Sequence, residues 1–289
     1  MACVPGNTTG FIRGSAAVGG SSVPEHTVAS LTAFAIAKQE VKFADWLIVR
    51  TWATNNGYAF QNAGVQGSTG GGTDQHPVTT ISWRDSIVWC NAASQKQGLT
   101  PVYYTDASFT TPLKTSTAGG INATAGSEDN PYVNWSANGY RLPTEAEWEF
   151  AARYLNASSF LRGDAPSGWQ DNNTANALVD TLEIEAVAWW TSNAGGGTNP
   201  VALKAANALG IFDMSGNLWE HVWDWSGSYT TVSPYTDADS RGPSAVATNR
   251  VFRGGSWTNA AANQGSAFRN ASVPSFTAND VGFRPARRP

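Results

Sequence analysis

The chain of 289 residues combines 13 tryptophans with 29 glycines, and this pairing restricts the folds open to it. Glycine reaches the positive φ angles that irregular loops need, while indole rings are large apolar groups that can fill a core. The combination predicts a loop-rich fold packed around aromatic side chains. Charged residues are only 14% of the chain, against about 25% on average. This composition excludes a charge-rich disordered protein and a long coiled coil.

Three helices are predicted in the first half of the chain. Residues 43–54 carry apolar side chains at helical spacing, and Gly57 lies just beyond them. A second helix is predicted within 82–98 and a third from Thr144. Both starts have a hydroxyl cap followed three positions later by an acid, which is the capping-box pattern.

Little regular structure is predicted elsewhere. Apolar and polar residues alternate in part of 28–42, which predicts a strand-like segment there. Residues 99–140 suggest strand fragments within polar loops. Beyond Leu155 we expect short apolar runs and no helix. The chain has no linker with a shift in composition and no internal repeat, so 1–289 is interpreted as one α+β domain.

The charge pattern argues against nucleic-acid binding, because the net charge is −4. Residues 240–289 nevertheless hold seven arginines and a single acid. We expect these arginines to bond loop carbonyls; a basic binding surface is the alternative. The acids at 145, 147 and 149 are expected to be structural. No transmembrane segment or secretory signal is evident.

A search for catalytic motifs finds none. The three histidines lack HxxxH spacing, and the two cysteines form neither a metal knuckle nor a disulfide framework. There is no GxSxG elbow, phosphate loop or GxGxxG turn. The residues by themselves therefore suggest no reaction.

Five motifs occur in a characteristic order: 78–85 (VTTISWRD), 141–149 (RLPTEAEWE), 216–220 (GNLWE), 253–257 (RGGSW) and 281–284 (VGFR). Together they resemble the formylglycine-generating enzyme (sulfatase-modifying factor) family over nearly the whole chain. The resemblance implies a C-type-lectin-like fold, α+β and low in regular secondary structure.

Activity does not follow from that fold. The family's aerobic enzymes use two cysteines spaced C-x4-C before an arginine, and the matching positions, counted back from Arg269, are Ala261 and Ser266. The iron-dependent branch needs an HxxxHxE cluster, which this chain lacks. The resemblance therefore implies that the chain is not an enzyme. An oxidoreductase of the parent family and an invariant structural member are the alternatives.

Residues 257–280 resemble the variable region of diversity-generating retroelement target proteins. Such proteins carry a hypervariable ligand-binding patch at the C-terminal end of a lectin-like scaffold. The segment is rich in the residue types that adenine-directed mutagenesis of Asn codons yields, between the fixed-looking Arg269 and Pro274. An ordinary surface loop is the alternative. The predicted patch comprises Trp257, Thr258, Ala260, Ala262, Asn263, Phe268, Ala271, Ser272, Val273, Ser275, Phe276, Ala278 and Asp280.

The patch is expected to bind through aromatic anchors, namely Trp257, Phe268 and Phe276, ringed by small polar residues. Further residues are expected beneath it: Trp219, Trp223, Trp225 and Trp257 as an aromatic floor, with Arg253, Arg269 and Arg284 bonding loop carbonyls. The resemblance implies a protein or glycan ligand on another cell. It also implies a monomer at the bacterial cell surface, held by a lipid anchor outside this chain.

No cofactor is expected, although the resemblance suggests a structural calcium as a possibility to weigh. The ligands would be the carboxylates of Asp213 and Glu220 and the carbonyls of Gly216 and Leu218, since oxygen ligands suit this cation. The favoured expectation is instead a tight turn at 215–217 with Glu220 paired to an arginine.

Overall fold

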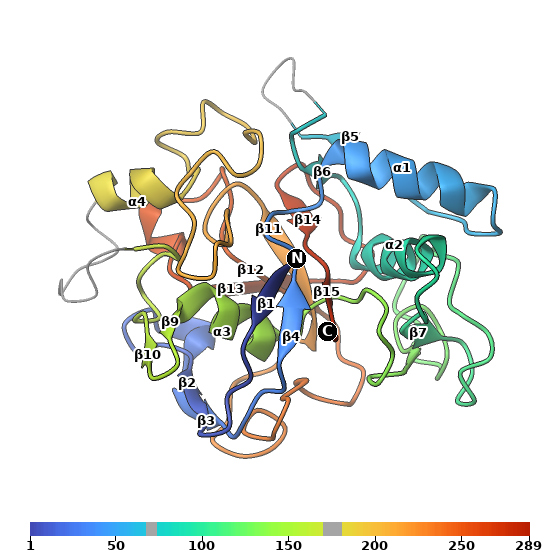
Figure 1. Ribbon diagram of the computed structural model, residues 1–289, viewed down its shortest axis with the longest axis horizontal. Coiled ribbons are helices and arrows are strands. Elements are labelled where there is room, and N and C mark those ends of the chain that lie inside the picture. The colour runs from blue at the N-terminus through green and yellow to red at the C-terminus, as the bar shows by residue number, and fades with distance from the viewer. Residues whose placement is uncertain (68–73, 170–180) are drawn as a thin grey trace.

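A four-stranded sheet occupies the centre of the computed structural model, which describes residues 1–67, 74–169 and 181–289 (Figure 1). Its strand order is β13-β12-β11-β14. The strands are β11 (Trp219–Trp225), β12 (Arg250–Arg253), β13 (Arg269–Ser272) and β14 (Val281–Phe283). β14 runs parallel to β11, whereas the other neighbours are antiparallel. Three of the five motifs recognised in the sequence therefore contribute to one sheet.

A second sheet joins the two ends of the chain. β4 (Phe34–Ile36) pairs with β1 (Ala2–Val4) on one side and β15 (Ala286–Arg287) on the other. The remaining strands form short pairs: β2 (Phe11–Arg13) with β3 (His26–Val28), β5 (Val65–Gln66) with β6 (Val78–Thr79), β7 (Tyr103–Tyr104) with β8 (Tyr132–Val133), and β9 (Tyr154–Asn156) with β10 (Ser159–Phe160). The α+β class with low regular structure is confirmed.

The predicted helices are confirmed as α1 (Phe43–Thr54), α2 (Trp83–Lys96) and α3 (Glu145–Arg153). Complete capping boxes begin α2 at Ser82 and α3 at Thr144. Among the described residues no helix is long and apolar enough to cross a bilayer.

Two sequence expectations are wrong. A fourth helix, α4 (Thr181–Val187), follows Leu155; its seven residues are too few to show a helical period. Residues 28–42 are not one strand-like segment: Val28 ends β3, 34–36 form β4 in another sheet, and Leu31 and Lys42 make isolated bridges.

Aromatic side chains fill the interior as the composition predicted. One apolar cluster lies around α1 and α2, where Trp46 and Trp89 stack in parallel at 6.3 Å between ring centres. Another surrounds α3, where Trp148 faces Glu220 of the central sheet and Phe150 packs against Phe11 of β2, 5.1 Å between ring centres. These clusters fix the sheet from both sides.

The glutamates of α3 are buried ion-pair partners, as expected. Glu145 accepts two hydrogen bonds from the Arg269 guanidinium, at 2.7 and 2.9 Å. Glu149 accepts from Arg253 of β12 at 2.5 Å and from Arg153 at 2.7 Å. The helix is therefore tied to β12 and β13 by charge as well as by packing.

The substitution Glu145→Gln is expected to destabilise the fold by about 3–5 kcal/mol at neutral pH, because it leaves buried guanidiniums without their counter-charge. Burial alone would raise the pKa of Glu145, but Arg269, Arg13 and Arg253 lower it to about 2. The stability that the ionised Glu145 contributes is therefore complete above the pKa of this carboxyl in the unfolded chain. It is lost as pH falls towards 2, the pKa in the folded protein. Urea unfolding of the original protein and of the Glu145→Gln variant, from neutral pH down towards pH 2, measures this loss of stability. The exposed Glu25→Gln is the control, and a loss no larger than the control's would contradict the assignment.

Candidate binding surface

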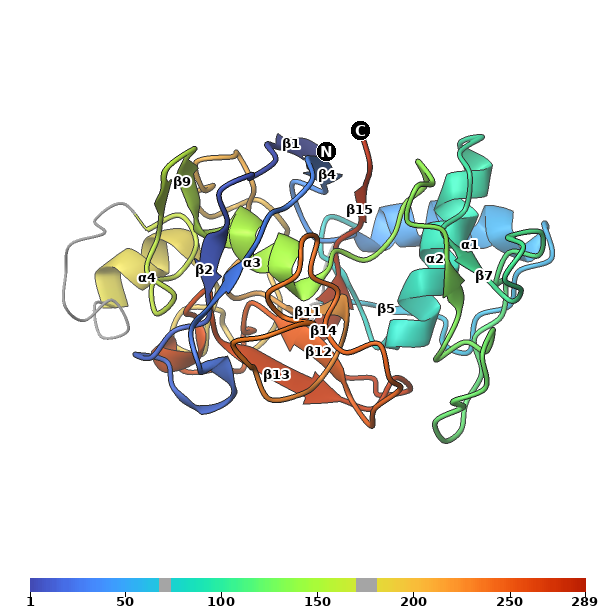
Figure 2. The same cartoon turned by 90° about the horizontal axis from the view of Figure 1, so that it is seen from below.

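Residues 257–280 form edge strand β13 and the two loops that flank it. The loops begin and end side by side, since the Thr258 hydroxyl donates to the Asp280 carboxylate at 2.8 Å. The Trp257 indole also donates to the Asn279 carbonyl at 3.4 Å. Figure 2 shows β12 and β13 on the side of the molecule opposite to the two chain ends. The segment is thus a continuous part of one surface.

Most residues of this segment are exposed or half-buried, and the buried ones are 264–267, Arg269 and Pro274. Every one of the thirteen predicted patch residues is exposed or half-buried, including Val273 at 38% and Phe276 at 37%. The fixed-looking Arg269 and Pro274 are buried. Between the patch residues also lie the buried Gln264, Gly265, Ser266 and Ala267. The structure therefore separates an outward set from an inward set, with the predicted positions all outward.

Buried arginine holds the first loop at its base. Arg253 donates to the carbonyls of Ser266, Ala267 and Phe268 at 2.7–3.1 Å, besides its ion pair with Glu149. The chain leaves β12 through Gly255, whose φ is +73°; a Cβ there would lie 2.6 Å from the Asn263 carbonyl. The loop backbone is therefore determined by residues that do not reach the surface.

The two other arginines have different targets. Arg269 bonds the carbonyl of Gly227 and the carboxylate of Glu145, so it anchors β13. Arg284 donates to the carbonyls of Ala37 and Phe212, which lie outside the segment. The structural role of these arginines is confirmed, but the expected place of Arg284 beneath the patch is wrong.

An aromatic row supports the patch. The ring of Phe268 lies 5.8 Å from that of Trp219, which lies 6.0 Å from Phe252. Phe276 stacks on Phe252 at 6.1 Å with an interplanar angle of 19°. Phe252 was missed in the sequence. The available signal was its position in the strand, next to the inward Arg253 and two residues after Arg250. Neighbouring strand residues face opposite sides, so Phe252 faces away from the side that Arg253 occupies.

The rest of the expected tryptophan floor lies elsewhere. Trp223 packs on Trp83 and Tyr103, 5.6 and 5.5 Å away, beside α2. Trp225 stacks against the Arg250 guanidinium at 3.5 Å. Trp257 is half-buried at the rim of the patch. Of the four tryptophans, Trp219 alone lies under the patch.

A profile of the sulfatase-modifying factor enzyme 1-like domain matches residues 5–289. The chain belongs to the sulfatase-modifying factor family. A protein named chaperone protein LppX, from Paenibacillus barcinonensis, is 31% identical over 245 residues, or 79% of this chain and 70% of that protein. The formylglycine-generating enzyme of Thermomonospora curvata is 34% identical over 166 residues. The match covers 55% of this chain and only about half, 52%, of that enzyme.

The fold is also that of solved structures. Treponema denticola variable protein 1 superposes with a TM-score of 0.76 at 29% identity, over 100% of this chain and 95% of that one. These comparisons confirm the predicted C-type-lectin-like fold of a single domain. They also confirm the resemblance to formylglycine-generating enzymes and to a variable protein.

The family's cysteine positions lie within the first loop of the patch. Ala261 begins a 3-10 turn (Ala261–Asn263), and Ser266 is buried beside Arg162. The chain's own thiols are elsewhere: Cys3 is in β1, and Cys90 is in α2, where burial raises its pKa. Neither family position can supply a thiolate.

Of the four residues considered for calcium, Glu220 is already paired. Its carboxylate accepts from Arg284 at 2.6 and 2.7 Å and from the Trp148 indole at 2.8 Å. The pairing of Glu220 with an arginine is thus confirmed. Gly216 and Asn217 form the expected turn with positive φ. No cluster of three His, Cys, Asp or Glu suited to a metal occurs in the part of the chain that the structure describes.

Asp213 differs from Glu220. One carboxylate oxygen accepts from the Ala202 amide at 2.7 Å, but the other is buried without a hydrogen bond. Burial, with Glu220 nearby, raises the pKa of Asp213 to about 6. Burial, together with the nearby Asp213 and Glu220, also raises the pKa of Glu40. Glu40 was not among the residues predicted from the sequence. Three buried carboxylates therefore meet one guanidinium, that of Arg284. Asp213 fits a cation ligand, whereas Glu220 could bind one only by sharing its oxygens with Arg284.

The separation into inward and outward positions predicts unequal tolerance to substitution. Ala262→Tyr at an exposed position should change the free energy of unfolding by no more than about 0.5 kcal/mol. Ala267→Tyr at a fully buried position should cost at least about 1–3 kcal/mol through overpacking. Urea unfolding compares the two, which make the same change in the same loop. Equal losses would show that the outward positions are not free to vary.

Proposed function

We propose that this protein is a non-catalytic binder whose ligand-binding surface consists of the thirteen predicted patch residues within 257–280 and is diversified by a retroelement. One observation carries the proposal: every predicted variable position is exposed or half-buried, while 264–267, Arg269 and Pro274 are buried beneath them. A binding surface on loops held by a rigid scaffold tolerates sequence change. Similarity to a variable protein along the full chain supports it.

Phe276 and Phe268 supply the binding energy in this proposal. Phe276 is exposed yet braced by Phe252, so little side-chain freedom is lost on binding. Phe268 and Trp257 are half-buried, with Phe268 at the other end of the aromatic row, and the patch also contains small residues such as Ala260 and Ser275. Rigid aromatic anchors with an adaptable polar rim are typical of binding surfaces that accept different partners.

The proposed ligand is a protein or glycan on another cell. The patch lies opposite the two chain ends, so a chain attached to a membrane from that side would present the patch outwards (Figure 2). We accordingly propose display at the bacterial cell surface as a monomer, through a lipid anchor outside this chain.

Two alternatives have discriminating observations. An oxidoreductase of the parent family would consume oxygen in the presence of a cysteine peptide and copper, but the cysteine positions hold Ala261 and Ser266. An invariant structural member would lack gene diversification. A second, near-identical copy of the codons for 257–280, beside a reverse transcriptase gene and differing only at adenines, would exclude that alternative.

The double substitution Phe268→Ala and Phe276→Ala is expected to weaken binding of a captured surface ligand at least tenfold, because each ring is an anchor. Titration calorimetry or surface plasmon resonance measures the change, and thermal unfolding checks that the fold survives. Phe109→Ala is the control, since Phe109 has a similar exposed fraction of 41% and lies in the loop after β7. Unchanged affinity in the double variant would overturn the proposed surface.

We also propose that a calcium ion binds beside Asp213, Gly216 and Leu218, where the unbonded Asp213 oxygen and the excess of buried carboxylates favour a cation. Calcium added after EDTA treatment should raise the unfolding temperature, and magnesium should not. Asp213→Asn keeps the side-chain shape and tolerates the positive φ of 54° at this position. This variant should lose the calcium response. An equal response in both proteins would contradict the site.

A further inference from the structure

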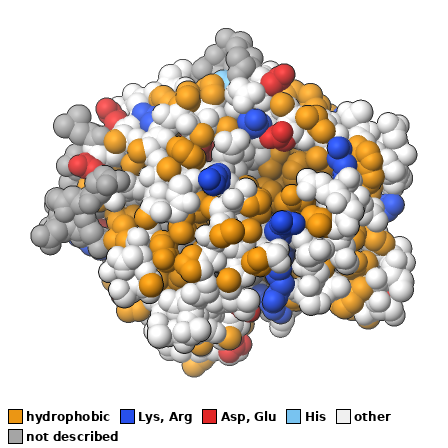
Figure 3. Space-filling model, viewed as in Figure 1, with side chains coloured by type: hydrophobic (Ala, Val, Ile, Leu, Met, Phe, Trp, Pro, Cys, Tyr) orange, Lys and Arg blue, Asp and Glu red, His pale blue; other side chains and the backbone are white. Residues whose placement is uncertain are grey.

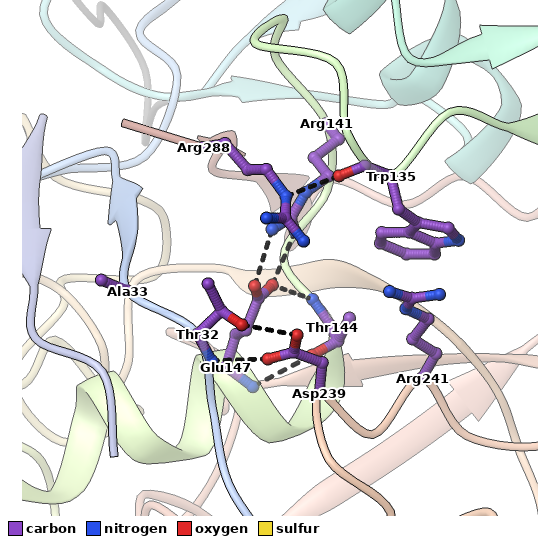
Figure 4. A pocket seen from close by; sticks show the side chains of 9 residues that line it. All are labelled: Thr32, Ala33, Trp135, Arg141, Thr144, Glu147, Asp239, Arg241 and Arg288. Atoms are coloured by element: carbon purple, nitrogen blue, oxygen red, sulfur yellow. Dashed lines mark hydrogen bonds and ion pairs between the residues drawn. The ribbon is translucent and has the colours of Figure 1, made fainter. Parts of the chain in front are cut away.

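A small hollow lies on the face that carries the chain ends, away from 257–280. Lys and Arg side chains gather in a column on that face (Figure 3). The hollow has a volume of about 20 Å³, and Trp135, Arg141, Arg241 and Arg288 line it (Figure 4). Such a volume holds one oxygen-sized group. The arginines come from three separate segments, so the fold alone assembles the hollow.

The two acids in the wall are already satisfied. The Glu147 carboxylate accepts from both terminal nitrogens of Arg141, each at 2.6 Å, and from the Thr144 amide at 2.8 Å. Asp239 accepts from the Thr32 amide at 2.5 Å and its hydroxyl at 2.7 Å. Glu147 therefore neutralises Arg141, while Asp239 is held by neutral donors and leaves the other arginines without a direct partner.

Arg241 and Arg288 keep donors that nothing else uses. Arg241 lies flat against the Trp135 ring, 4.1 Å from its centre. Arg288 donates through Nε to the Trp135 carbonyl at 2.6 Å, which orients its terminal nitrogens. Among the described residues neither guanidinium forms an ion pair with an acid. Burial lowers the pKa of Arg241; the nearby charges of Asp239 and Glu147 act to raise it, while those of Arg141 and Arg288 act to lower it.

The side chains that line the hollow therefore carry an excess of positive charge. Three guanidiniums face two carboxylates, and the two unpaired guanidiniums are both held in place by Trp135. Pre-oriented guanidinium forks bind carboxylate, phosphate and sulfate groups through paired, charge-assisted hydrogen bonds. Holding the forks before binding reduces the entropy lost when an anion is bound.

We propose that Arg241 and Arg288 form a binding site for a single oxyanion group, with one anion oxygen in the hollow and the remainder of the ligand at its mouth. The narrow volume selects a terminal group rather than a whole ring. A carboxylate and a phosphate or sulfate ester share this chemistry. This second site is independent of the variable patch and goes beyond the proposed function.

The test follows thermal unfolding of the full chain in acetate, inorganic phosphate or sulfate, each against chloride at equal ionic strength. We expect at least one anion to raise the unfolding temperature saturably, by about 2–4 °C at saturation. The double variant Arg241→Gln, Arg288→Gln should lose that increment. Arg287→Gln, which removes a neighbouring half-buried charge, should keep it.

Each outcome bears on the proposal. A response to acetate alone identifies a carboxylate site, and a response to phosphate or sulfate identifies a tetrahedral oxyanion site. General salting-out by sulfate would stabilise all three proteins equally, and equal increments would overturn the site. Loss of the response in Arg287→Gln would also overturn it, because net charge would then be the cause. If the double variant does not fold, Arg241→Gln alone gives the same comparison.

Discussion

The buried pairing of the α3 glutamates with arginines from the C-terminal strands is the constraint on which the molecule depends. Glu145 meets Arg269 and Glu149 meets Arg253, across more than a hundred residues of chain. A buried charge is costly unless its partner arrives with it. The helix and the two strands must therefore come together, and this fixes β12 and β13 before any surface loop is considered.

That arrangement divides the C-terminal segment into two layers. Arg253 holds the loop carbonyls and Trp219 with Phe252 supports the rings, whereas positions such as Ala262 and Phe276 make few demands on the fold. In the function we propose, the family scaffold serves as a binding scaffold, and the fold forms with Ala261 and Ser266 at the family's cysteine positions. The same base that restricts the backbone permits variation at the surface.

Much of the local structure could be predicted. Helices α1, α2 and α3 followed from apolar spacing and capping boxes, which act within a few residues. Helix α4 did not, since seven residues carry too little periodicity. The outward positions of the patch were anticipated from residue types. Its support was anticipated only in part, because Trp223 and Trp225 turn towards α2 and Arg250 instead.

The sequence by itself determined the family, the three long helices and the segment that carries the proposed binding surface, because these depend on motifs and on contacts between near neighbours. Tertiary structure alone decided which side chains meet. It paired Glu220 with Arg284, placed Phe252 under Phe276 and brought Arg241 and Arg288 to one tryptophan, Trp135. Such meetings join residues far apart in the chain, and no local spacing encodes the distance between them.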